Sequence, residues 1–204
     1  MGTPAHSRLE GRLAALPPTF TATQARQAAI SSRDLTILTT SGDIEELSRG
    51  VYRRADAPAT AHLDLLAVCL RAPRAVVCGE SALAIHELID DIPMSVHIAI
   101  PRGTHRPSIS YPPTTVTQYA AETFSLAIER FEAAPSEMIP MYSAARSVVD
   151  AMRHRRRFGE TLALAALGRY LRREGHNGVR DLQEIARDLG ALSTIRPSIE
   201  AVLA

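Results

Sequence analysis

Lysine is absent from this sequence: all 23 basic residues among its 204 positions are arginines. The absence excludes any mechanism that needs a side-chain amine, such as a Schiff base or the phosphate-binding lysine of a P-loop or an ordinary protein kinase. Only two cysteines occur, Cys69 and Cys78, and they form no Cys-x-x-Cys pair. We therefore expect buried free thiols in a reducing compartment and no metal site.

Long apolar segments and a large excess of one charge are also missing. No run approaches the ~18 apolar residues that a membrane-spanning helix requires. Residues 1–16 carry Arg8, Glu10 and Arg12, where a signal peptide would be apolar. These features predict a cytoplasmic protein with no membrane partner. The net charge of +1 means that any nucleic-acid surface must be a local patch.

The densest structural signals lie between Thr21 and Arg54. Thr21 and Gln24 fit a capping box at the start of one short helix, and Ser31 fits the N-cap of a second. Leu35 and Leu38, three residues apart, are expected to face the core from that second helix. Two β-type segments then flank a turn at residues 48–50, where a glycine supplies positive φ. Two helices followed by a hairpin with a basic tip predict a winged helix-turn-helix.

A winged helix-turn-helix predicts DNA binding, with the second helix in the major groove and the hairpin tip on phosphates. The residues expected to contact DNA are Ser32, Arg33, Thr36, Thr39, Thr40, Arg49, Arg53 and Arg54. The alternative is a helical module that only packs against a neighbour. Because the recognition face is rich in threonine, we expect modest, salt-sensitive affinity and repression by two self-associating copies on repeated half-sites.

This stretch resembles the N-terminal domain of AbiEi-type antitoxins. The most specific part is Arg-Gly-Val-Tyr-Arg at residues 49–53, and Phe-Thr-x-x-Gln-Ala-Arg at residues 20–26 adds to it. The pattern Val-Val-x-Gly-Glu-Ser-Ala-Leu at residues 76–83 and the helix Ser-Ala-Ala-Arg-Ser-Val-Val-Asp at residues 143–150 extend the resemblance. Family members tend to carry several arginines on the second helix, where this chain has threonines.

The resemblance implies the antitoxin of a two-gene pair, of type IV or of the related type VII group with kinase-like antitoxins. It implies a nucleotidyltransferase-like toxin as partner and repression of the operon through promoter repeats. One alternative is an atypical serine/threonine kinase that phosphorylates the toxin. Only this alternative requires cofactors, which would be ATP and magnesium. Another is a stand-alone transcription regulator. The kinase-like Ser-Arg-Asp-Leu at residues 32–35 lacks the rest of a kinase signature, so enzymatic activity and catalytic residues stay open.

The predicted fold class is α+β. We expect the winged helix-turn-helix in residues 1–56, a linker ending near Thr60, which would cap the next helix, and an antitoxin domain in residues 61–204. Its α/β part would span residues 61–142, with short strands that include 123–128 and a proline-containing edge strand at 138–142. Residues 143–204 would form a helical bundle, in which Ser143 caps the first helix and further helices span residues 159–173, 179–189 and 194–203.

Arginines are concentrated in the predicted bundle. The side chains expected to bind the toxin are Arg153, Arg155, Arg156, Arg157, Arg169, Arg172 and Arg173. The alternative is a solvated helix end, where cations favour the carbonyl terminus.

Ser81 with His86 and His97 suggests a hydrolase, but without a Gly-x-Ser-x-Gly motif a helix cap and two partly buried histidines fit better. The acidic residues Glu87, Asp90 and Asp91 fit a helix end and turn better than a magnesium site.

Overall fold

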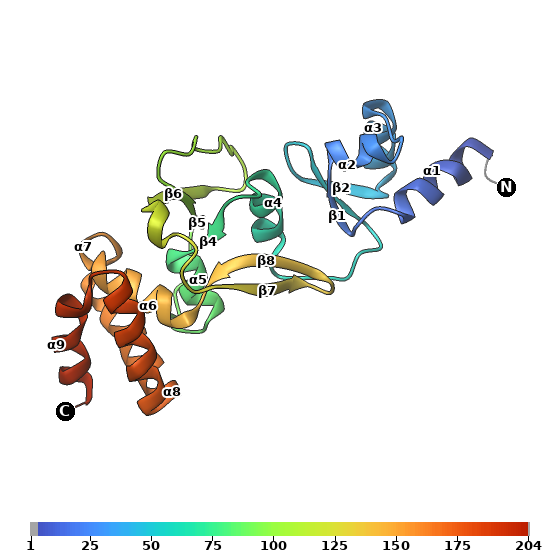
Figure 1. The fold of residues 1–204 in the computed structure, drawn as a ribbon. Helices are drawn as coiled ribbons and strands as arrows, with labels where there is room; N and C mark the ends of the chain where they lie inside the picture. The colour runs from blue at the N-terminus through green and yellow to red at the C-terminus, as the bar shows by residue number, and fades with distance from the viewer. Residues whose placement is uncertain (1–3, 204) are drawn as a thin grey trace. The chain divides into compact units, whose positions relative to one another are not determined.

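The computed structural model describes residues 4–203, and these form two compact units (Figure 1). Unit 1 contains the described residues up to Pro73 together with Pro107–Pro113 and Glu132–Ile139. Unit 2 contains Arg74–Arg106, Thr114–Phe131 and the described residues from Pro140 onward.

Unit 1 begins with three helices, α1 (Pro4–Ala14), α2 (Ala22–Gln27) and α3 (Ser32–Ser41). Thr21 caps α2 as predicted: its hydroxyl accepts a hydrogen bond from the Gln24 N–H at 3.2 Å, and the Gln24 side-chain oxygen accepts from the Thr21 N–H at 2.7 Å. This reciprocal pairing satisfies two amides that a helix start leaves free. The local sequence therefore determines where the helices begin.

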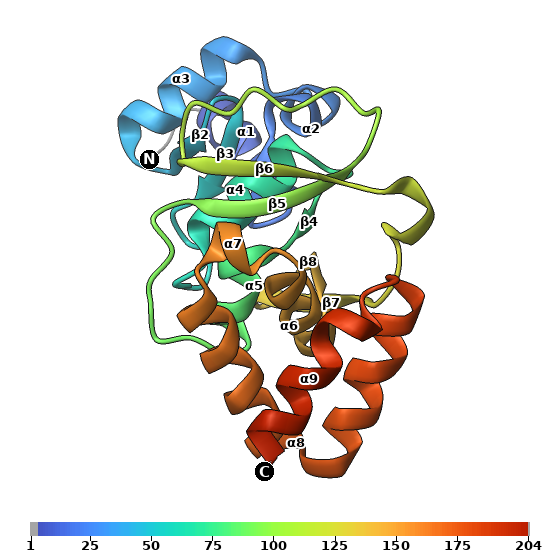
Figure 2. The same cartoon turned by 90° about the vertical axis from the view of Figure 1, so that its left-hand side faces the viewer.

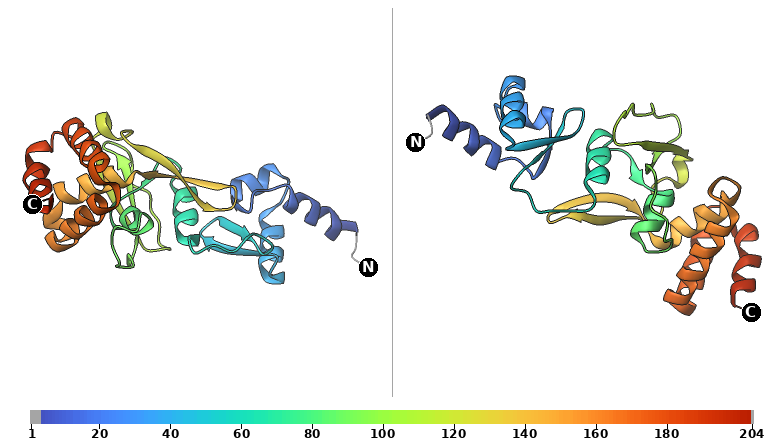
Figure 3. Two further views of the ribbon diagram at one scale, coloured as in Figure 1. Left: turned by 90° about the horizontal axis from the view of Figure 1, so that it is seen from below. Right: turned by 180° about the vertical axis from the view of Figure 1, so that it is seen from behind.

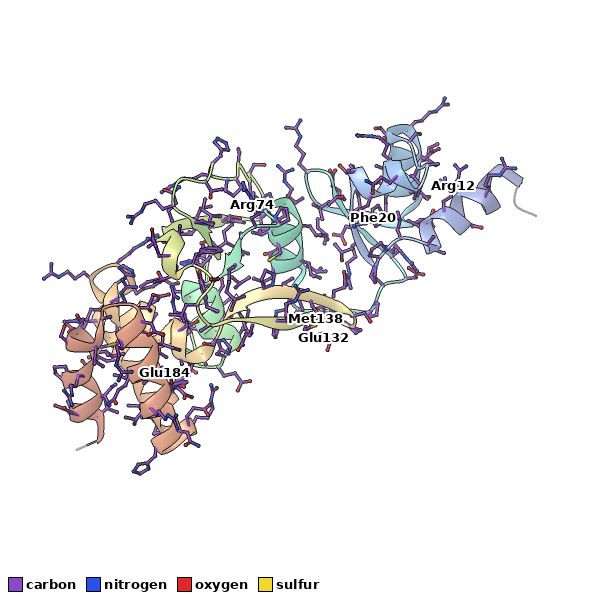
Figure 4. The ribbon with its side chains drawn as sticks, in the orientation of Figure 1. Arg12, Phe20, Arg74, Glu132, Met138 and Glu184 are labelled. Carbon is purple, nitrogen blue, oxygen red and sulfur yellow. The ribbon has the colours of Figure 1, made fainter. Side chains whose placement is uncertain are left out.

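A small antiparallel sheet completes the winged helix. Its strands are β1 (Thr19–Thr21), β2 (Ile44–Ser48) and β3 (Val51–Arg54), in the order β1-β3-β2. The sequence predicted β2 and β3, whereas the three-residue β1 was too short to recognise. The common core contains Leu13, Leu16, Phe20, Ala25, Ile30, Leu35, Leu38 and Ile44, and Phe20 is labelled in Figure 4.

Helix α4 (Leu63–Arg71) also belongs to unit 1, because it contacts all three strands of the small sheet. The predicted boundary in residues 57–60 is therefore too early. Thr60 does not supply the N-cap of α4: the cap residue is His62, which makes no side-chain capping bond. The Thr60 hydroxyl instead donates to the Ala133 carbonyl in the segment 132–139, so residues distant in sequence complete this unit.

The larger sheet has five strands: β4 (Val76–Val77), β5 (Val96–Pro101), β6 (Thr114–Tyr119), β7 (Ile128–Ala134) and β8 (Glu137–Tyr142). Their order is β6-β5-β4-β8-β7. Strands β5 and β6 run side by side in parallel, as Figure 2 shows, and β4 is antiparallel to β5 but parallel to β8. The β7–β8 hairpin is the yellow pair in Figure 3, and its tip, residues 132–139, belongs to unit 1.

Two strand predictions in this region are wrong. Residues 123–127 form the end of a 3-10 helix (Ala121–Thr123) and a turn, because the Thr123 and Leu126 carbonyls accept hydrogen bonds from the buried Arg146 guanidinium at 3.0 and 3.2 Å. Strand β8, which contains Pro140, lies inside the sheet and not at its edge. The proline is tolerated because β8 pairs with the two-residue β4 only at Val77–Met141.

Five helices complete unit 2: α5 (Gly79–Ile85), α6 (Ala144–Arg153), α7 (Arg155–Phe158), α8 (Glu160–Asp188) and α9 (Leu192–Leu203). Ser143 caps α6 as predicted, accepting from the Arg146 N–H at 3.3 Å. Helix α8 is interrupted at Gly175, whose φ of 60° and ψ of −139° are not helical. Its two arms match the two helices predicted for this region.

The α+β prediction is confirmed: a helix-turn-helix domain is followed by a mixed sheet and a C-terminal helical region. Within residues 4–203, no helix is long and apolar enough to cross a membrane. Cys69 and Cys78 are free and buried. Burial raises the pKa of the Cys69 thiol to about 12 and raises that of Cys78 further, so both stay protonated and unreactive at neutral pH.

Candidate functional site

Helix α3 presents one face to the core of unit 1 and the opposite face to solvent. Ser31 and Asp34 form a second capping box, in which the Ser31 hydroxyl donates to the Asp34 carboxylate at 2.7 Å and accepts from the Asp34 N–H at 3.2 Å. The hydrogen bond from the Ser31 hydroxyl is the main cause that lowers the Asp34 pKa. Leu35 and Leu38 are buried. The carboxylate of the kinase-like Ser-Arg-Asp-Leu run therefore serves as a helix cap.

The predicted DNA-contact residues of α3 are all solvent-exposed: Ser32, Arg33, Thr36, Thr39 and Thr40. The Arg33 guanidinium forms no ion pair or hydrogen bond with any other residue that the structure describes. The three threonine hydroxyls donate to carbonyls of the same helix. Arg33 is thus the single free cation of this face.

Arg49 is the free cation of the wing. It is exposed in the turn between β2 and β3, and its side chain makes no ion pair within the described part of the chain. The next residue, Gly50, has a φ of 73° and donates its N–H to the Glu46 carboxylate at 2.8 Å. A residue without Cβ adopts this left-handed conformation without strain, which explains why a glycine occupies the predicted turn.

Arg53 is buried inside unit 1, which contradicts its predicted contact with DNA. The Arg53 residue is 5% exposed. Its guanidinium donates to the Glu137 carboxylate at 2.6 Å, to the Thr19 hydroxyl at 2.5 Å and to the Pro58 carbonyl at 2.6 Å. Burial and these three hydrogen bonds keep the guanidinium away from solvent, where a phosphate would have to reach it. Arg53 is a structural residue of unit 1.

Arg54 is also engaged within unit 1, so its predicted phosphate contact is corrected as well. The guanidinium forms a two-point pair with Asp56, with N–O distances of 2.8 and 2.6 Å. It also donates to the Ala14 and Leu16 carbonyls at 3.2 Å each. The hydrogen bond from Arg54 lowers the Asp56 pKa, which keeps the pair ionised.

Sequence reasoning overlooked Arg26, an exposed arginine on α2 that has no ion pair among the described residues. Its position in the first helix of a helix-turn-helix, which crosses the DNA backbone in such domains, was the available signal. Between residues 12 and 55 the chain carries six arginines and four carboxylates. Arg53 and Arg54 are engaged with carboxylates, and Arg12 donates to the Ala29 carbonyl at 2.8 Å, so the arginines without such partners are Arg26, Arg33 and Arg49.

A second arginine cluster lies at the end of α6 and in α7. Arg153, His154, Arg155, Arg156 and Arg157 line a surface cavity of about 400 Å³ together with Thr194. Arg153 pairs with Asp150 at 3.4 Å, and Arg155 pairs with Glu160 at 3.5 Å. The exposed Arg156 and Arg157 side chains have no ion pair in the described part of unit 2.

The other predicted partner-binding arginines lie on the first arm of α8. Arg169 forms a two-point pair with Asp90, whose Oδ1 accepts at 2.7 Å, and this hydrogen bonding lowers the Asp90 pKa. Arg173 donates to Glu174 at 2.8 Å and to the His86 carbonyl at 2.7 Å. Arg172 is exposed and forms no ion pair within residues 4–203. Of this trio, Arg172 is the side chain that is free for a partner.

The hydrolase-like residues form no catalytic arrangement. The Ser81 hydroxyl accepts from the His97 backbone N–H at 2.9 Å, so Ser81 is bonded to the main chain and not to an imidazole. The His86 Nε2 lies 2.9 Å from the Tyr142 carbonyl oxygen. Among residues 4–203 no group of three His, Cys, Asp or Glu side chains could hold a metal ion.

Comparison with known proteins agrees with the geometry of unit 1. Residues 12–55 match the family model described as "Transcriptional regulator, AbiEi antitoxin". This match covers the end of α1, both helices of the helix-turn-helix and the whole wing. No curated protein matches the chain. In residues 12–55, about a fifth of its length, the chain is similar to the AbiEi antitoxin family of transcriptional regulators.

Proposed function

We propose that the protein represses its own operon by binding promoter repeats through α3 and the wing, and that it neutralises a nucleotidyltransferase-like toxin through unit 2. The observation that supports the DNA-binding half is the pair of unengaged arginines, Arg33 on α3 and Arg49 on the wing. These are the two elements that contact the major groove and the backbone in winged helices. No cofactor is needed for either activity.

Replacing both Arg33 and Arg49 with alanine is expected to abolish operator binding while toxin neutralisation continues. Each lost phosphate contact should weaken binding by at least about tenfold and lower the salt slope by about 1. The measurement is a titration of the chain's own upstream DNA at several salt concentrations. Arg180→Ala with Arg187→Ala is the matched control, because it removes the same charge from exposed positions in unit 2.

Loss of both activities in the Arg33→Ala/Arg49→Ala variant would contradict this division of labour. Unchanged DNA affinity and an unchanged salt slope would contradict the assignment of these arginines. The threonine-rich face of α3 and the near-neutral net charge support modest affinity for one copy. Effective repression therefore requires two copies on repeated half-sites, which a titration of repeat number would reveal as cooperative binding.

The partner-binding half of the proposal rests on Arg156 and Arg157, which line the cavity at α7 without internal ion pairs. Replacing both with glutamate should weaken the complex with the toxin by at least about tenfold, because repulsion replaces attraction at the rim of the interface. Co-purification with the product of the adjacent gene, and growth rescue on co-expression, are the measurements. Arg180→Glu with Arg187→Glu carries the same charge change elsewhere in unit 2. Equal loss in both variants would rule out a specific role for the α7 cluster.

A further inference from the structure

The exposed face of α3 offers few hydrogen-bond donors although most of its residues are polar. The Thr36 hydroxyl donates to the Ser32 carbonyl at 3.1 Å, and the Thr40 hydroxyl donates to the Thr36 carbonyl at 2.8 Å. The Thr39 hydroxyl donates to the Leu35 carbonyl at 2.9 Å. Each hydroxyl proton is thus held by the helix's own backbone. What these side chains can offer to a partner is a methyl group and an oxygen lone pair.

Ile37 adds a larger apolar group to the same face. It is 48% exposed, whereas Leu35 and Leu38 of the same helix are 5% and 1% exposed. With 3.6 residues per turn, positions 33, 36, 37 and 40 form one continuous stripe opposite the two buried leucines. The stripe therefore consists of one free guanidinium, at Arg33 in the first turn, followed by methyl-bearing side chains.

This chemistry matches one feature of the major groove. Thymine is distinguished there by its 5-methyl group, which makes apolar contacts with side chains such as the threonine methyl, while guanine is read by arginine. Building on the proposed DNA binding, we propose that Thr36, Ile37 and Thr40 read thymine methyl groups. The half-site would then carry thymines beneath the middle and end of α3. Specificity would come from apolar contact and not from threonine hydrogen bonds.

Deoxyuridine tests this proposal directly, because it differs from thymidine only by the missing methyl group. A duplex would first be selected from a randomised library by the full-length wild-type protein. Replacing its thymines one at a time with deoxyuridine should lower wild-type affinity about threefold to fourfold at each contacted position. Thymines outside the footprint serve as controls and should show no change.

Paired substitutions separate methyl readout from hydroxyl readout. The Thr36→Ser/Thr40→Ser variant keeps the hydroxyls and removes the methyls, so it should bind the thymine duplex about tenfold more weakly. It should lose its sensitivity to deoxyuridine at the thymines that Thr36 and Thr40 contact, and keep it at the thymine that Ile37 contacts. The Thr36→Val/Thr40→Val variant keeps the β-branched shape and should bind at least as tightly as wild type. Ile37→Ala should reduce sensitivity at one thymine per half-site. Circular dichroism of each variant verifies that α3 remains folded.

Three outcomes would overturn this inference. The first is equal wild-type affinity for the thymine and deoxyuridine duplexes, while Arg33→Ala/Arg49→Ala still abolishes binding. This result would contradict methyl readout and leave the proposed DNA binding supported. The second is loss of binding with valine and retention with serine, which would assign the readout to the hydroxyls. The third is failure of the wild-type protein to select any duplex, which would overturn the proposed repressor function together with this inference.

Discussion

Replacing Arg146 with methionine is expected to lower the free energy of unfolding of unit 2 by about 3–5 kcal/mol. Arg146 is 1% exposed and pairs with Asp150, which is 2% exposed, at 2.8 Å. The guanidinium also lies 4.6 Å from the centre of the Tyr142 ring and 5.5 Å from that of Tyr119. Burial raises the pKa of both phenols, so the rings remain neutral beside the cation. Removing Arg146 leaves a buried carboxylate with only the longer Arg153 contact.

Hydrogen exchange measures this loss in unit 2 while peptides of unit 1 serve as an internal reference. The expected result is faster exchange across α6 and both arms of α8, with unit 1 peptides unchanged. The double variant Arg146→Met/Asp150→Leu should recover part of the loss, because it removes the unpaired charge together with its partner. Arg146→Lys should remain destabilised, because an ammonium cannot reproduce the planar, multi-donor geometry. A loss below about 1 kcal/mol would show that the pair contributes little.

Under the proposed function, the Arg146→Met variant should also separate the two activities. Toxin neutralisation should fail at temperatures where the weakened unit 2 opens, while DNA binding through α3 and the wing should persist. A stand-alone transcription regulator would show no growth defect from the same substitution. The variant therefore also distinguishes the antitoxin proposal from that alternative.

The features that the sequence predicted correctly are those whose causes are local. Thr21 with Gln24 and Ser31 with Asp34 form their capping boxes within four residues of chain, so the helix starts could be read directly. The Leu35–Leu38 spacing identified the buried side of α3, and Gly50 identified the turn of the wing. These three signals together predicted which side of α3 is exposed to solvent.

The incorrect predictions share a physical reason, which is that the deciding partner lies far away in sequence. Arg53 was expected on DNA because it follows a basic turn, but its carboxylate partner, Glu137, is 84 residues later. Residues 123–127 were expected as a strand, but carbonyls of this segment accept hydrogen bonds from Arg146, about 20 residues later. Local composition cannot reveal such pairings. The residues next to Arg53 would be the same whether it contacted DNA or Glu137, and those next to residues 123–127 would be the same for a strand or a turn.

Replacing Glu137 with alanine is expected to cost unit 1 about 3 kcal/mol of unfolding free energy. The Arg53 and Glu137 side chains are 7% and 9% exposed and 2.6 Å apart. Glu137 also accepts from the Thr19 N–H at 3.0 Å, so the substitution leaves a buried cation without its carboxylate and a β1 amide without its acceptor. Because β1 pairs with β3 of the wing, the proposed DNA binding should decline at temperatures that wild type tolerates.

Glu132→Ala is the matched control for this substitution. Glu132 lies on the same hairpin, is exposed, and accepts from the Ser136 N–H at 2.9 Å (Figure 4). Its loss should change unit 1 stability by less than about 0.5 kcal/mol. The double variant Arg53→Met/Glu137→Met should regain much of the stability, because two apolar side chains leave no buried charge. Recovery of DNA binding in that double variant would establish that Arg53 supports the wing through Glu137 and makes no contact with phosphate. Failure to recover, with unit 1 folded, would restore Arg53 to the DNA-binding surface.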